Sequence, residues 1–132
     1  MILKLKFLKH ESASEFIKRK DKYFNEHNAI KIKDIGRGGV HYFVREAWTF
    51  LVQSSLKEKV FVIERLRKES TVGKLAYKNW RKGDIEYRIG YYIVGQIGRT
   101  RGKWVWGQFC PLVPKNDLDT LLKKAKKEGT IY

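Results

Sequence analysis

The chain has 132 residues, of which 42% are apolar and 14% aromatic, and it contains one cysteine. This length suits one domain over residues 1–132, and the apolar content is too high for a disordered tail. No stretch has the apolar length of a signal peptide or of a membrane span, which takes about 20 residues. Since one cysteine cannot form an internal disulfide, we expect a cytoplasmic protein. Because no apolar stretch of sufficient length is present, we expect no membrane partner.

Charge is the most informative property of the composition. Lys and Arg total 29 against 14 Asp and Glu, which gives a net charge of +15. Such an excess favours polyanionic partners, above all nucleic acid. The alternative is a thermophile surface, because a Lys-rich chain with few Gln, Met and Cys residues is typical of hyperthermophiles. Thermophile surfaces usually balance Lys with Glu, however, and this chain does not.

The N-terminal part predicts a strand, a helix and a second strand. Residues 2–8 and 29–35 alternate apolar and polar side chains, as half-buried strands do. Ser12 followed by Glu15 is a capping-box pattern, so a helix is expected from there to about His27.

Two hairpins and a helix are expected in the rest of the chain. Residues 40–53 and 60–69 read as strands joined by a turn at 54–59, although a helical stripe also fits 43–56. A second hairpin joins 85–96 to 103–113 through the loop 97–102. The last helix follows Pro114, with Asn116 or Asp117 as its cap and Gly129 at its end, and its apolar stripe is Leu118, Leu121, Leu122 and Ala125.

These elements predict an α+β fold. An antiparallel, hairpin-rich sheet would carry the N-terminal and the C-terminal helix, both packed on one face.

The tip of the second hairpin reads GQIGRTRGKWVWGQ and holds three cations without an acid. Arg99, Arg101 and Lys103 suit a phosphate track or a groove. Trp104 and Trp106 point to one face of their strand, where they either fill the core or form a platform on which bases stack. We expect Trp106 to pack inside and Trp104, nearer the tip, to be partly exposed and available to a base.

A second basic segment, residues 74–88, interleaves cations with aromatic side chains. This pattern suits single-stranded nucleic acid or RNA loops, whose unstacked bases need flat partners, but it also fits side chains that lie over a core. The candidate binding residues are Lys74, Lys78, Trp80, Arg81, Lys82 and Arg88. Arg37, in the tight turn GRGGV, is a further candidate for a phosphate contact.

Catalytic signatures are weak. His10, His27 and His41 are dispersed and the cysteine is alone, so no metal or cofactor is predicted. Glu46 and Glu64 lie on neighbouring strands and could share a metal, but pairing across the strands with Arg45 and Arg65 is favoured. If the chain is an enzyme, His41, Glu86 and Arg88 are the candidates for metal-free RNA cleavage.

The sequence therefore predicts a nucleic-acid-binding module that prefers RNA or single strands. The first alternative is a small metal-independent ribonuclease or nuclease built on the same surface. The second is an adaptor or inhibitor that docks on an acidic protein or a ribonucleoprotein. A binding protein is favoured over an enzyme.

Overall fold

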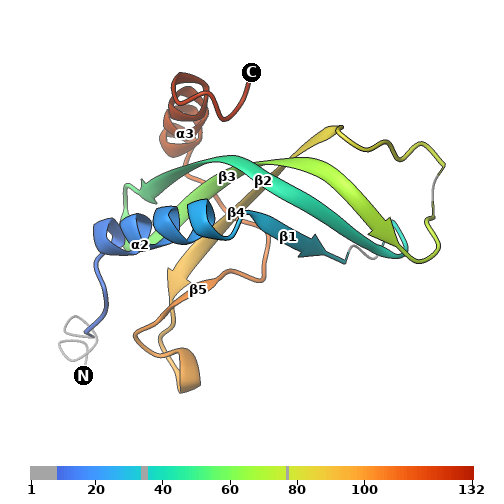
Figure 1. Cartoon of the computed structure of the whole chain (residues 1–132). Helices are drawn as coiled ribbons and strands as arrows, with labels where there is room; N and C mark the ends of the chain where they lie inside the picture. The colour runs from blue at the N-terminus through green and yellow to red at the C-terminus, as the bar shows by residue number, and fades with distance from the viewer. Residues whose placement is uncertain (1–8, 34–35, 77) are drawn as a thin grey trace.

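The computed structural model describes residues 9–33, 36–76 and 78–132 and shows a curled, five-stranded antiparallel sheet with two α-helices (Figure 1). The order of strands in the sheet follows the chain. The elements are α2 (Ala13–Glu26), β1 (Ala29–Ile32), β2 (Val40–Gln53), β3 (Leu56–Val72), β4 (Ile85–Val94), the short 3-10 helix η1 (Gly98–Thr100), β5 (Trp104–Trp106) and α3 (Lys115–Lys127). The α+β class is confirmed. The strand predicted at residues 2–8 lies outside the described residues.

The hairpin of β2 and β3 forms the middle of the sheet. Its β-branched and aromatic residues favour strand, and the helix considered for residues 43–56 does not form. The expected six-residue turn is too long, because only Ser54 and Ser55 lie between the two strands. Register shifts mark bulges, which bend and twist the hairpin, between Tyr42 and Phe43, Arg45 and Ala47, and Val52 and Gln53.

Helix α2 begins as the sequence predicts. Ser12 Oγ accepts a hydrogen bond from Glu15 N at 3.1 Å, and Glu15 accepts one from Ser12 N at 3.3 Å, which completes the capping box. Phe16 and Phe24 of this helix are fully buried against the sheet.

Helix α3 differs from the expectation at its start and on its surface. Pro114 is the N-cap, and the Asp117 carboxylate instead accepts a hydrogen bond from Ser54 N at 2.9 Å. Asp117 thus ties the helix to the β2–β3 turn. Only Leu121 and Ala125 of the predicted stripe are buried, whereas Leu118 and Leu122 are exposed. None of the described helices is long and apolar enough to cross a membrane.

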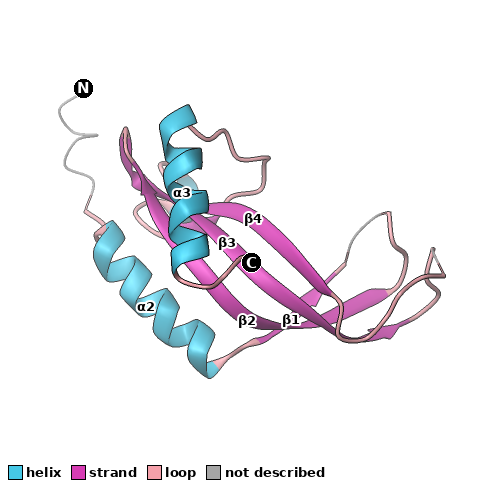
Figure 2. Ribbon diagram, turned by 90° about the horizontal axis from the view of Figure 1, so that it is seen from above, coloured by secondary structure: helices cyan, strands magenta, loops and turns pink. Residues whose placement is uncertain are grey.

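The two helices cover opposite faces of the sheet, so the expected packing on one face is wrong. Alternate residues of a strand point to opposite faces. Val60 and Val62 of β3 pack in one cluster with Phe16 and Phe24 of α2, while Phe61 and Ile63 pack in another with Leu121 and Ala125 of α3. Figure 2 shows α3 in front of the strands, and Figure 1 shows α3 above β2 and β3 and α2 below them. We call the two sides the α2 face and the α3 face.

Candidate nucleic-acid interface

The tip of the β4–β5 hairpin presents three cations. Gly98 and Gly102 adopt φ of 67° and 76°, a left-handed conformation that glycine accepts without strain, and the tip folds back through a bond from Gly102 N to Gly95 O. The side chains of Arg99, Arg101 and Lys103 are exposed, and none of them has an ion-pair partner within the described part of the chain.

The acidic side chains of the described residues, in contrast, have partners within the chain. Each has a hydrogen-bond donor or a basic side chain within 4.0 Å. The unpaired cations of the tip are therefore not offset by unpaired acids. The acids concerned are Glu11, Glu15, Asp21, Glu26, Glu46, Glu58, Glu64, Glu69, Asp84, Glu86, Asp117, Asp119 and Glu128.

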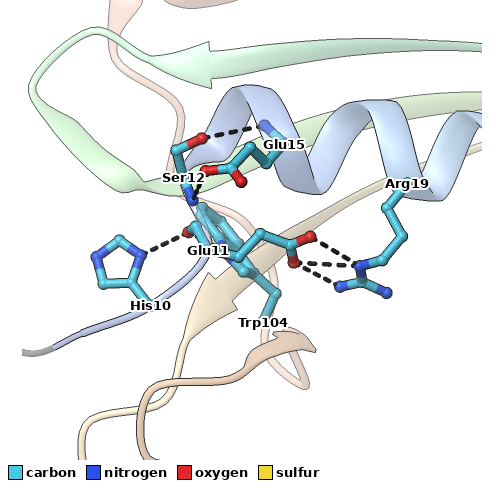
Figure 3. A network of polar contacts seen from close by, with 6 residues as sticks. All are labelled: His10, Glu11, Ser12, Glu15, Arg19 and Trp104. Carbon is cyan, nitrogen blue, oxygen red and sulfur yellow. Dashed lines mark hydrogen bonds and ion pairs between the residues drawn. The ribbon is translucent and has the colours of Figure 1, made fainter.

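The structure reverses the expected exposure of the two hairpin tryptophans. Trp104 is 9% exposed, its ring stacks on Phe16 with centroids 4.6 Å apart, and its Nε1 donates to the Glu11 carbonyl at 2.7 Å (Figure 3). Trp106 is 37% exposed. The N-terminal segment covers Trp104, so Trp106 is the tryptophan of this hairpin that a base can reach.

The second basic segment enters β4 at residue 85, and its first part, residues 74–84, lies at the other end of β4 from the tip (Figure 1). Lys74 and Lys78 are exposed, and Trp80 is half-buried beside a hollow of about 440 Å³. Arg81 lies 3.4 Å from Asp84, and Lys82 lies 4.0 Å from Glu69, so these two cations are partly neutralised. Because β4 has ten residues, about 33 Å separates this segment from the hairpin tip.

A cavity of about 190 Å³ opens between these two segments and brings together three of the candidate residues. Arg37, Glu86 and Arg88 line it, and Arg37 forms an ion pair with Glu86. The rest of the wall consists of Tyr87 and three apolar side chains, those of Ile32, Phe43 and Leu66. Sequence reasoning missed this apolar wall, which comes from three different strands.

The three residues proposed for catalysis do not form one site. His41 is fully buried, its Nε2 lies 3.0 Å from the Gly38 carbonyl oxygen, and it does not line the cavity. Glu86 and Arg88 do share the cavity, but each already has an ion-pair partner.

The pairing of Glu46 and Glu64 with arginines is confirmed. Arg45 Nε lies 2.8 Å from Glu64, and Arg65 Nε lies 2.7 Å from Glu46. Arg67 also binds Glu46, and this hydrogen bond lowers the pKa of the Glu46 carboxyl. The described residues hold no group of three His, Cys, Asp or Glu side chains suited to a metal ion.

Comparison of the chain with protein-family models, with curated proteins and with solved structures gives no match. A function has to be argued from the residues of the site themselves, because a fold alone does not imply one.

Proposed function

We propose that this protein binds nucleic acid, preferably RNA or a single strand, through the hairpin tip and the α2 face of β4. The observation that carries the proposal is the tip itself. Its three exposed cations have no ion-pair partner among the described residues, although the acids nearby are all engaged. Unpaired cations on an exposed turn add little to folding, whereas they bind phosphates well.

The arrangement along β4 supports an elongated ligand. The tip and the 74–84 segment are about 33 Å apart, a span equal to about ten base steps at 3.4 Å per step. Arg88 and the exposed Trp106 lie between them. A nucleic-acid strand that follows β4 would therefore meet cations at both ends and an aromatic ring on the way.

Binding without cleavage is favoured over the nuclease alternative. The buried His41 has no access to a substrate hydroxyl, and Glu86 is held by Arg37. The exposed Cys110, the single cysteine of the chain, fits a reducing compartment such as the cytoplasm. An adaptor that docks on an acidic protein would use the same cations, and the experiment below separates it from a nucleic-acid binder.

The test is the salt dependence of affinity, measured by fluorescence anisotropy with labelled single-stranded RNA, single-stranded DNA and duplex DNA. With about six phosphates contacted, affinity should fall by roughly 10³-fold between about 50 and 200 mM salt. Arg99→Ala with Arg101→Ala should weaken binding and reduce the salt slope by about 1.4 on a single strand.

The matched control is Lys126→Ala with Lys127→Ala, which removes the same charge from exposed positions at the end of α3. Equal losses in the two double variants would assign binding to net charge and not to the tip. An affinity that barely depends on salt, or no binding of any probe, would refute the proposal and leave the adaptor alternative.

A further inference from the structure

Charged side chains gather on the α2 face of the sheet beyond the end of α2. Arg45 and Lys68 are each 7% exposed, and Glu64 is fully buried. Arg37, Glu86 and Arg88 line the cavity on the same face. The described residues thus gather both basic groups (37, 45, 68 and 88) and acidic groups (64 and 86) here.

Glu64 fixes the direction of Arg88. Its two carboxylate oxygens bind different arginines: Oε1 accepts from Arg45 Nε at 2.8 Å, and Oε2 accepts from Arg88 Nε at 2.6 Å. A guanidinium has five N–H donors, and the only hydrogen bond that Arg88 makes within the described residues uses Nε. Its remaining donors are therefore available beside the cavity that Arg88 lines.

Gly90 lets the Trp106 ring lie directly on β4. A Cβ atom at residue 90 would come within 2.3 Å of Cη2 and 2.6 Å of Cζ2 of Trp106, so any larger residue would displace the ring. The Arg88 guanidinium lies 4.6 Å from the ring centroid, and Tyr92 meets the ring edge-on at 5.0 Å. The ring thus adjoins Arg88, which lines the cavity.

We propose that the cavity and Trp106 together bind one unstacked nucleotide of a single strand. Its phosphate lies between Arg37 and Arg88, and its base stacks on Trp106. The cavity, at about 190 Å³, is smaller than the roughly 300–1,000 Å³ of sites for small molecules, which suits one group of a longer ligand. This inference rests on the proposed function and adds to it a preference for single strands, because paired bases are stacked on each other and do not reach the ring.

The first experiment compares Trp106→Leu with wild-type protein on single-stranded RNA, single-stranded DNA and duplex DNA. Loss of one stacked base should lower single-strand affinity by about 5–150-fold and leave duplex affinity nearly unchanged. Trp106→Phe should fall between the two, and circular dichroism checks that each variant is folded. Phe109→Leu is the matched control, since Phe109 is an 81% exposed aromatic residue outside the cavity.

The second experiment removes the negative charge of Glu86. This carboxylate competes with a phosphate for Arg37, so Glu86→Gln should raise single-strand affinity by several-fold more than Asp119→Asn. The control makes the same change of charge at an exposed ion pair with Lys123 on α3. Equal gains in both variants, or a loss in Glu86→Gln, would overturn the inference.

The outcomes separate this inference from the proposed function. If wild-type protein binds none of the probes, both are wrong. If wild-type protein binds and the double arginine variant of the tip is impaired, while Trp106→Leu binds single strands as wild type does, the function stands and the nucleotide site is wrong. An equal loss on single strands and duplex in Trp106→Leu would also refute the stacked base.

Discussion

Replacing Glu64 by Gln should destabilise the protein severely, although it removes only a charge. Glu64 is fully buried, and the Arg45 side chain that it binds is 7% exposed. The second partner, Arg88, is 30% exposed and can turn toward water, so the cost falls mainly on Arg45. Removing one partner of a buried ion pair costs about 3–5 kcal/mol, a large part of the roughly 5–15 kcal/mol that stabilises a domain.

Urea unfolding followed by circular dichroism measures this loss directly. Asp119→Asn is the control, because the side chains of Asp119 and Lys123 are 67% and 76% exposed and their pairing is worth little. A second variant, Glu64→Leu with Arg45→Met, removes both buried charges and should be more stable than Glu64→Gln. If the free energy of unfolding of Glu64→Gln lies within about 1 kcal/mol of the wild-type value, the buried Arg45 finds compensation without Glu64, and the reasoning fails.

Two further predictions concern Trp104 and Glu46. Trp104→Ala should cost about 3–5 kcal/mol in urea unfolding, because it leaves a hole beside Phe16; a cost below about 1 kcal/mol would mean that the ring is not in the core. Glu46→Gln should destabilise the protein at neutral pH but not in acid. Since Arg67 holds the folded-state pKa of Glu46 below its usual 4.5, the contribution of this group is complete above that value and is lost as the pH falls through the lowered pKa. Urea midpoints of wild type and Glu46→Gln, measured at pH values above and below the titration of Glu46, check this. A difference between the two proteins that is the same at all pH values would contradict it.

Local patterns in the sequence identified most of the elements. The capping box at Ser12 predicted the start of α2, and the position of Glu46 and Glu64 on neighbouring strands predicted their ion pairs with Arg65 and Arg45. The side on which each helix packs was missed, although a signal exists. The run VFVI at residues 60–63 is buried throughout, and continuous apolar runs are typical of strands covered on both faces.

The candidate site could be predicted only in part, because it depends on contacts between distant segments. The exposed tip cations follow from local sequence. The burial of Trp104 depends on Glu11, which is 93 residues away in the chain, and no local pattern reveals which tryptophan the N-terminal segment covers. Arg37 and Glu86 meet across 49 residues, so the cavity they line could not be inferred from spacing.

The strand order has a consequence for how the chain folds. Each strand of the sheet pairs with its neighbour in the sequence, so no loop between paired strands is longer than the 12 residues 73–84, and the entropy lost on closing these loops is modest. The sheet can form step by step as the chain leaves the ribosome. Contacts outside the sheet span more of the chain, and the end of α3 is one case: it returns to β2, where Thr49 binds Glu128 across 79 residues. Until α3 is synthesised, Phe61 and Ile63 lack the cover of Leu121 and Ala125, and the nascent chain exposes an apolar surface at this stage.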